Sequence, residues 1–246
     1  SCSCYHGVTT VIMGNCGFTL APCSADEADF VFRNLERAED LSREAMLAGI
    51  DWQWETFPEY LDVLESLPKG INYGGYIGHS ALRTYVMGER AFSEQATEDE
   101  LRTMERQVQE AVRVGAIGFS TSRTYNHLTS DDRPVASRIA EWEEVRRIVT
   151  AMGQTGSGIF ELAGEAPGRS ERRQADYFGR LKSLAVESGV PVTYGMPSIR
   201  IAPELWPAYY DLGDEVAEAG GRLFVQAHSR SISTLLSFKS HTPFDE

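Results

Sequence analysis

Cysteine, histidine and long apolar runs are all scarce in this chain. Four of its 246 residues are cysteine, at positions 2, 4, 16 and 23, and five are histidine. A secreted disulfide scaffold would distribute its cysteines along the whole chain, so their confinement to the amino-terminal end favours a reducing compartment, which we expect to be the cytoplasm. No apolar run approaches the ~18 residues of a membrane span, and no basic-then-apolar leader is present, so we expect no membrane partner.

Positive charge is also in short supply. The chain has 23 lysines and arginines against 36 aspartates and glutamates, a net charge of −13. A phosphate backbone would be repelled, which argues against nucleic acid as a partner. The glycine fingerprints of dinucleotide and nucleoside triphosphate sites are missing as well. The remaining composition, 42% hydrophobic and 24% charged, is that of an ordinary globular protein.

What the chain does contain is a repeated order of a helix, a glycine and a short apolar strand. A parallel neighbour strand needs a crossover, and a helix is the usual crossover. The pattern therefore predicts an α/β protein with a parallel sheet, whose chemistry lies at the carboxyl ends of the strands. Six strands are predicted, at residues 8–13, 71–77, 116–120, 158–162, 190–194 and 222–226.

The helices between these strands have local support. Thr97 and Glu100 form the pattern of a capping box before a helix that runs to residue 114. Two stretches exceed a minimal helix–strand unit. We expect a helix over residues 27–48, and we expect the polar segment 123–138 to be a substrate loop, because it follows the carboxyl end of a strand.

The most specific string is Gly14-Asn15-Cys16-Gly17, which follows the apolar strand predicted at residues 8–13. The strand places Cys16 at its carboxyl end, and the glycines permit a left-handed backbone and close approach of neighbouring chain. A thiolate at this position is a soft metal ligand or a nucleophile. A packed, inert cysteine at a strand end is the alternative.

Three strings resemble the N-acyl-D-amino-acid deacylases (D-aminoacylases) of the amidohydrolase superfamily. Residues 7–17 match the family's Gly-Val-Thr-Thr-Val-x-x-Gly-Asn-Cys-Gly, and residues 78–83 match its Gly-His-x-x-Leu-Arg. Residues 115–125 are similar to Gly-Ala-x-Gly-x-Ser-Thr-Gly-Leu-x-Tyr. The resemblance implies a (β/α)8 TIM barrel with a small β-sandwich built from both termini. Residues 1–246 would then be a partial barrel of six to seven units, with the sandwich and the last barrel strands outside this chain.

The resemblance implies a zinc-binding role for Cys16 and hydrolysis of a small N-acyl amino acid or related amide. Several family ligands have no counterpart here: the His-x-His before the cysteine strand, the histidines of the fifth and sixth strands, and the aspartate near the last strand. Glu161 and His228 lie at strand ends and are candidates to replace lost ligands, because zinc accepts carboxylate oxygen and imidazole nitrogen. The alternatives are a solvated or ion-paired glutamate at a strand end and a structural histidine.

Four residues of the other two strings are candidates for substrate binding. His79 can orient substrate, or it can hydrogen-bond a neighbouring loop. Arg83 can grip a substrate carboxylate with its guanidinium, or pair with a nearby acid. Tyr125 matches a family position that contacts substrate, and Arg123 stands where the family has an apolar residue. The Arg123 difference implies a changed substrate preference.

Two hypotheses of different classes follow. The first is a metal-dependent amidohydrolase that acts on a carbon–nitrogen bond other than a peptide bond, with zinc as cofactor. The second is a catalytically inactive, metal-free barrel that acts as a binding or structural module. Ser120 and Thr121 are expected to satisfy backbone groups, because no Ser-His-Asp arrangement is visible. The open edges of an incomplete barrel predict a homo-oligomer.

Overall fold

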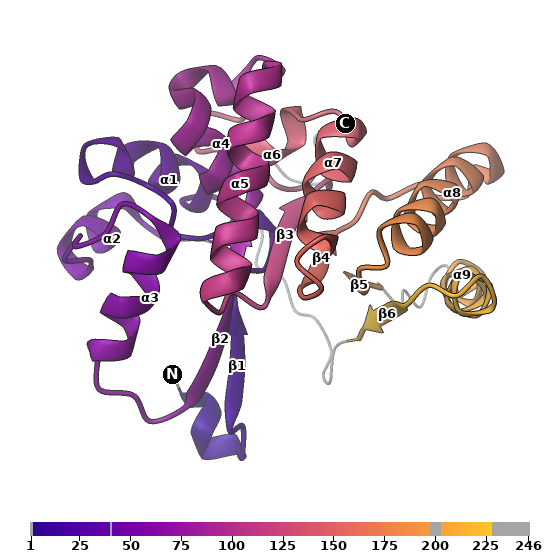
Figure 1. The fold of residues 1–246 in the computed structure, drawn as a ribbon, viewed down its shortest axis with the longest axis horizontal. Helices are drawn as coiled ribbons and strands as arrows, with labels where there is room; N and C mark the ends of the chain where they lie inside the picture. Colours follow the sequence, from indigo (N-terminus) through magenta and orange to yellow (C-terminus); the bar gives the residue numbers. More distant parts are fainter. Residues whose placement is uncertain (1, 40, 197–202, 228–246) are drawn as a thin grey trace.

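The computed structural model describes residues 2–39, 41–196 and 203–227. Within these ranges six parallel strands form one sheet, and each strand pairs with the next one along the chain (Figure 1). The prediction of an α/β protein with six parallel strands is confirmed, and each strand begins one or two residues later than predicted. The strands are β1 (Thr10–Met13), β2 (Asn72–Gly78), β3 (Gly118–Ser122), β4 (Ile159–Ala163), β5 (Val192–Gly195) and β6 (Leu223–Gln226).

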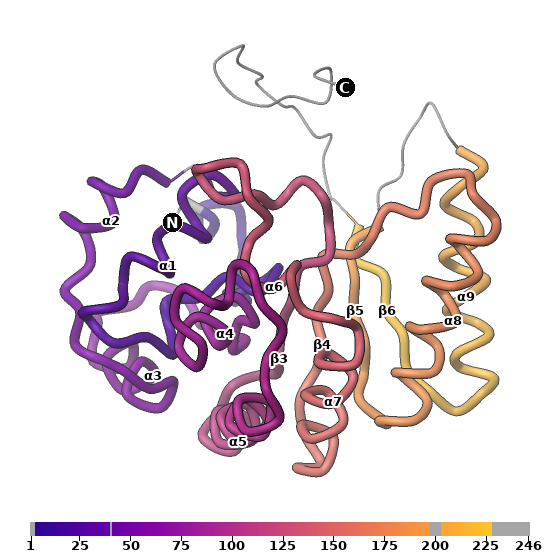
Figure 2. The backbone as a smooth tube through the Cα atoms, turned by 90° about the horizontal axis from the view of Figure 1, so that it is seen from above, coloured from indigo at the N-terminus to yellow at the C-terminus, as the bar shows by residue number. Residues whose placement is uncertain are grey.

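The sheet curls into a half-barrel with helices along its outer side. Figure 2 shows α5, α7, α8 and α9 following one another beside the strands. Among the described strands, β1 and β6 each pair on one side only, so the barrel is incomplete. The α-helices are α1 (Ala28–Leu35), α2 (Arg43–Gly49), α3 (Phe57–Ser66), α4 (His79–Met87), α5 (Glu98–Val114), α6 (Ala136–Ile139), α7 (Trp142–Gly153), α8 (Glu171–Ser188) and α9 (Pro207–Glu218). Short 3₁₀ turns are η1 (Cys2–His6), η2 (Asn15–Gly17), η3 (Ala25–Glu27) and η4 (Gly88–Phe92).

The main apolar core lies between the sheet and the outer helices. Side chains alternate along each strand, so every second residue faces this layer. Phe119 of β3 and Phe160 of β4 face it and stack, with ring centroids 5.9 Å apart. Their neighbours Ser120 and Glu161 are paired in register and point to the opposite, concave face. The alternation therefore places polar groups inside the half-barrel.

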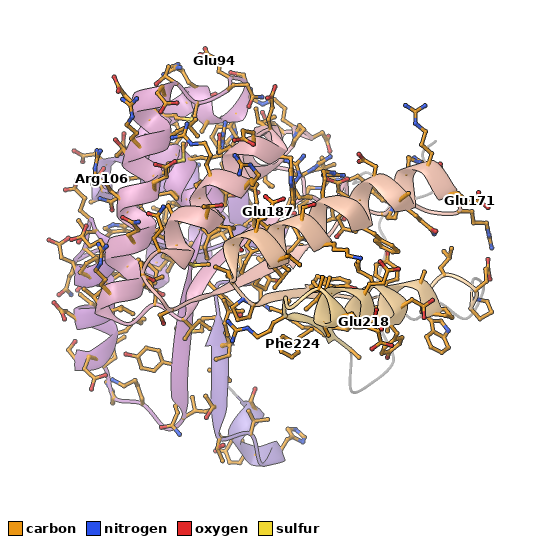
Figure 3. The ribbon with its side chains drawn as sticks, turned by 45° about the vertical axis from the view of Figure 1, so that its right-hand side comes forward. Glu94, Arg106, Glu171, Glu187, Glu218 and Phe224 are labelled. Carbon is orange, nitrogen blue, oxygen red and sulfur yellow. The ribbon has the colours of Figure 1, made fainter. Side chains whose placement is uncertain are left out.

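The concave face also carries exposed apolar side chains. Ile12, Ile159 and Phe224 belong to this face by register, and they are 49%, 37% and 57% exposed. Figure 3 labels Phe224 on β6, and it labels Glu187 and Glu218 on the outer helices α8 and α9. The helix side of the sheet is thus covered, whereas the concave side is covered around Ser120 and Glu161 and exposed at Ile12, Ile159 and Phe224 in the described part of the chain.

One prediction about the amino-terminal region is wrong. The helix expected over residues 27–48 is divided into α1 and α2, because Ser42 caps a new helix by accepting a hydrogen bond from the amide of Ala45 at 3.2 Å. The strand at residues 8–13 is not buried as a parallel strand would be, since Val8 and Ile12 are 40% and 49% exposed. The reason is that β1 pairs only with β2 among the described strands and lacks a covering layer on its concave side.

Helix starts were predicted more accurately. Thr97 and Glu100 form the predicted capping box of α5, with the Glu100 carboxylate 2.7 Å from the amide nitrogen of Thr97. Thr56 and Glu59 form a second box at α3. Among the helices that the structure describes, none is long and apolar enough to cross a membrane.

Candidate functional site

The cysteine string forms a strained turn at the carboxyl end of β1. Gly14, Cys16 and Gly17 have φ angles of 83°, 62° and 79°, all in the left-handed region. The two glycines adopt this conformation freely, but an L-residue such as Cys16 pays about 1–2 kcal/mol for it. A turn of this kind persists only where surrounding contacts hold it.

The contacts that hold the turn come from β2 and from the middle of β3. The amide of Gly17 donates a hydrogen bond to the Ser120 hydroxyl at 3.0 Å, and that hydroxyl donates to the carbonyl of Gly14. Neighbouring backbone is so close that a Cβ on Gly14 would lie 2.9 Å from the carbonyl oxygen of Tyr76. The expectation that Ser120 satisfies strand-end backbone groups is confirmed. This serine is fully buried and ties β3 to the turn.

Cys16 and Glu161 meet at the carboxyl edge of the sheet. The amide of Cys16 donates a hydrogen bond of 2.7 Å to Glu161 Oε2, although 145 residues separate the two in sequence. Glu161 is only 3% exposed, and the structure shows no salt bridge to it within the described residues. Burial raises the pKa of this carboxyl to about 7, and the Cys16 amide only partly offsets that rise. Burial, assisted by the charges of Glu161 and Glu39, raises the pKa of the Cys16 thiol to about 12.

Both shifts disfavour the charged form of the group, chiefly because the group is buried. A metal ion between them would favour both charged forms, and sulfur and carboxylate oxygen are both zinc donors. The described residues nevertheless hold no group of three or more histidine, cysteine, aspartate or glutamate side chains placed to bind one metal ion. The third metal candidate, His228, lies outside the described residues. Among the described residues, Cys16 and Glu161 are therefore two side chains that could hold a metal ion, fewer than a four-coordinate site requires.

Tyr76 is a neighbour of this pair that the sequence did not point to. It precedes the β2 carboxyl end, and burial together with the charge of Glu161 raises its pKa to about 12. Its hydroxyl therefore remains protonated and neutral near pH 7.

A second cluster is buried on the helix side of β3, and it contains His79 and Arg83. His79 Nε2 lies 2.7 Å from Glu144 Oε1, and its Nδ1 lies 2.8 Å from the hydroxyl of Thr121. Burial lowers the pKa of His79 despite the nearby carboxylate, so the ring is neutral. A carboxylate only accepts hydrogen bonds, so Nε2 carries the proton and Nδ1 accepts from Thr121. Arg83 Nη1 contacts both carboxylate oxygens of Glu144, at 2.6 and 2.5 Å.

This cluster leaves neither His79 nor Arg83 on the surface, since both are 0% exposed. Arg83 Nη2 also donates to the carbonyl of Glu94 at 2.7 Å and so fixes the loop before α5. Burial by itself raises the pKa of Glu144, but the hydrogen bonds from His79 and Arg83, together with the charge of Arg83, lower it to about 2. Direct contact of His79 or Arg83 with substrate would require this interior to open. Sequence analysis missed Glu144, which looks like one more acid at the start of a helix.

Arg123 and Tyr125 lie just beyond the end of β3, and the charge of Arg123 contributes to lowering the pKa of His79. The Arg123 guanidinium donates to the carbonyl of Ala140 and lies 3.6 Å from Glu165, on the loop after β4. It is thus held by protein groups at the edge of the sheet. Tyr125 is 59% exposed. Among the described residues, neither Arg123 nor Tyr125 forms a hydrogen bond or ion pair with Cys16 or Glu161.

The segment 123–138 contains one histidine that approaches the cysteine turn. His127 Nδ1 is 2.7 Å from the Ser122 hydroxyl, and the His127 ring packs on Phe18 with centroids 5.0 Å apart. Burial, with the nearby charge of Arg138, lowers the pKa of His127 to about 4. A neutral histidine therefore lies beside the residue that follows the turn, where sequence analysis expected only a loop position.

Several known proteins resemble this chain in sequence. The amidohydrolase family matches residues 1–236 of the chain. D-aminoacylase of Alcaligenes xylosoxydans xylosoxydans is 36% identical over 155 residues, which are 63% of this chain and 27% of that protein. N-acyl-D-aspartate deacylase of the same organism is 34% identical over 120 residues, which are 49% of this chain and 22% of that protein. The chain thus spans about a quarter of the length of the curated relatives it matches.

Solved structures support the fold. A crystal structure of D-aminoacylase superposes with a TM-score of 0.64 at 24% identity, covering 91% of this chain and 42% of that one. N-acyl-D-glutamate deacylase from Bordetella bronchiseptica, solved with zinc and a phosphonate inhibitor, gives a TM-score of 0.61 at 19% identity, covering 89% and 41%. The half-barrel is therefore that of an incomplete TIM barrel, and with the family match over nearly its whole length the chain belongs to the amidohydrolase family.

Proposed function

We propose that this chain carries part of the active site of a metal-dependent hydrolase that cleaves the amide bond of N-acyl-D-amino acids. The observation that carries the proposal is the meeting of Cys16 and Glu161 at the carboxyl edge of the sheet, joined by a 2.7 Å hydrogen bond. Active sites of parallel barrels lie at this edge. The relatives named D-aminoacylase, N-acyl-D-aspartate deacylase and N-acyl-D-glutamate deacylase supply the substrate class.

The metal proposed is zinc, with the Cys16 sulfur and a Glu161 oxygen as two of its donors. The buried carboxyl without a cationic partner among the described residues supports this assignment. Zinc bound in such a site lowers the pKa of a water molecule and polarises a carbonyl group. The remaining donors are proposed to come from outside the described residues, with His228 as one candidate.

The chain's own side chains have separate tasks in this proposal. The Cys16 amide fixes one oxygen of Glu161 and so orients the carboxylate. The neutral Tyr76 hydroxyl provides a proton donor near that carboxylate. Tyr125 and Arg123 at the rim are proposed to contact substrate, whereas His79 and Arg83 support the site from the interior, without touching substrate in this conformation.

The second candidate function is a metal-free binding or structural barrel. The observation that favours it is the lack of a three-residue ligand group among the described residues. Its concave face, with Ile12, Ile159 and Phe224 exposed, would then contact a second copy of the chain. A clean monomer in light scattering would contradict self-association. A reducing, cytoplasmic location is proposed on the cysteine pattern, and Cys16 and Cys23 form no disulfide.

The test combines zinc content with hydrolysis. Wild type, Cys16→Ala and Glu161→Gln are stripped with chelator, reloaded with zinc and assayed on N-acetyl-D-aspartate, N-acetyl-D-glutamate and an apolar N-acetyl-D-amino acid, with the L-enantiomers for comparison. The matched control is Cys23→Ala, because Cys23 is also buried but its thiol contacts the carbonyl of Ser24. We expect about one zinc per chain in wild type and control, and loss of zinc in the two site variants. Equal zinc content in all four proteins would refute the metal site.

A further inference from the structure

The two polar residues at the centre of β3 act on opposite sides of the sheet. Ser120 points to the concave side and bonds the cysteine turn, whereas Thr121 points to the helix side and bonds His79. Both are fully buried. Neither residue takes part in the proposed reaction, and both belong to the deacylase-like string at residues 115–125.

We propose that Ser120 is the positioning residue of Cys16. Its single hydroxyl bonds both ends of the turn, accepting from the amide of Gly17 and donating to the carbonyl of Gly14. The turn is thereby closed around Asn15 and Cys16. The proposal rests on the proposed function only for the role of Cys16 as a zinc ligand. The closure of the turn by Ser120 is independent of that role.

The chemistry of the turn requires a group that donates and accepts at once. A hydroxyl does both, whereas alanine does neither. With alanine at position 120, the buried amide of Gly17 would lose its acceptor, and the carbonyl of Gly14 would lose its donor. The left-handed conformation of Cys16 would then lose two contacts that oppose its strain.

The register of the sheet connects this closure to the carboxylate. Ser120 and Glu161 are direct partners in the pairing of β3 with β4. Ser120 holds the ends of the turn, and Glu161 accepts a hydrogen bond of 2.7 Å from the amide of Cys16. If the turn relaxes, that amide moves away from Glu161, and the hydrogen bond that joins Cys16 to the carboxylate is lost.

Thr121 adds rigidity from the other side. Its hydroxyl forms a hydrogen bond with His79, and His79 forms another with Glu144. Arg83 in turn donates to the Glu144 carboxylate. The strand that carries Ser120 is therefore anchored in the buried cluster. The three strings that resemble the deacylases therefore meet at β3.

The test measures how fast Cys16 reacts with iodoacetamide in metal-free protein, with each cysteine followed by peptide mass spectrometry. Ser120→Ala is expected to label Cys16 roughly tenfold faster than wild type, because two hydrogen bonds no longer oppose opening of the turn. The control is Ser122→Ala, which deletes an equally buried hydroxyl from the same face of β3, where it bonds His127 instead. It should label Cys16 at the wild-type rate. Equal rates in wild type and Ser120→Ala would overturn the proposal.

Labelling of Cys23 in the same samples reports whether the fold is intact, since this thiol is buried elsewhere. If Ser120→Ala accelerates Cys23 as well, Ser120→Thr decides the matter. This variant keeps the hydroxyl, so it should restore slow labelling of Cys16, and fast labelling would count against the proposal.

A second readout uses cobalt(II), whose absorption reports a bound thiolate. Ser120→Ala should need roughly tenfold more cobalt to reach half of the thiolate band, with Ser122→Ala unchanged. Wild type that binds no cobalt would contradict the proposed metal site, while the labelling rates of metal-free protein would still decide the role of Ser120.

Discussion

Replacing Glu144 by glutamine removes the charge that holds the interior cluster together. Glu144 is 4% exposed and Arg83 is 0% exposed, and the two are joined at 2.5 and 2.6 Å. Neither group is screened by water, so Glu144→Gln leaves a buried guanidinium without its counter-charge. Breaking a buried pair in this way costs about 3–5 kcal/mol. Glutamine keeps one acceptor oxygen for Arg83 or His79, so we expect a loss of about 3 kcal/mol.

The matched control is the adjacent residue on the same helix. Glu143 also forms an ion pair, with Arg146 at 2.6 Å, but its side chain is 56% exposed. An exposed pair of this kind contributes less than about 1 kcal/mol, so Glu143→Gln should be nearly neutral. The two variants remove the same charge from α7 and differ mainly in burial.

The assay is urea and thermal unfolding of both variants beside wild type at pH 7. For a chain of this size, about 3 kcal/mol corresponds to a fall in melting temperature of roughly 10 °C. Equal losses in Glu143→Gln and Glu144→Gln would refute the reasoning, because they would show that burial of the cluster does not set its strength.

Three further predictions concern pH, a helix cap and a close approach. As pH falls from about 4.5 toward 2, Glu144 binds a proton in the unfolded state but not in the folded state, so folding loses stability. His79, which is buried and neutral, adds a further loss of stability below its ordinary pKa of 6.5. The urea midpoint of wild type should therefore fall with pH, and the difference in stability between wild type and Glu144→Gln should shrink. Thr97→Ala removes the cap of α5 and should cost about 1 kcal/mol in urea unfolding. Gly118→Ala would drive a Cβ into the backbone of β4 and should abolish soluble expression, whereas Gly213→Ala, in open space on α9, should be neutral or stabilising in thermal unfolding.

The order of helices and strands was readable from the sequence because its signals are local. A glycine after an amphipathic run and a short apolar segment lie within a few residues of each other, and Thr97 with Glu100 marks a helix start directly. The helix over residues 27–48 was the exception. There the helical pattern continues through residues 36–42, and only the cap at Ser42 shows that a second helix begins.

The site was less readable, because its contacts join distant residues. Cys16 and Glu161 were candidates for their chemistry and their strand-end positions, and the structure brings them together. The pairing of His79 and Arg83 with Glu144 spans more than sixty residues and leaves no local pattern. Whether these three ionisable side chains are buried together depends on how α4 packs against α7, and the sequence alone does not show that packing.

The pairing order of the sheet has a consequence for how the chain acquires its site during synthesis. Each strand pairs with its successor, so the frame can form progressively as the chain emerges. The cysteine turn is different, because its hydrogen bonds reach residues 103, 106 and 145 positions further along. A nascent chain therefore carries its reactive thiol through the synthesis of three strands before Ser120 and Glu161 exist to restrain it. The cysteine turn can therefore gain all of its hydrogen bonds only after β3 and β4 have been made.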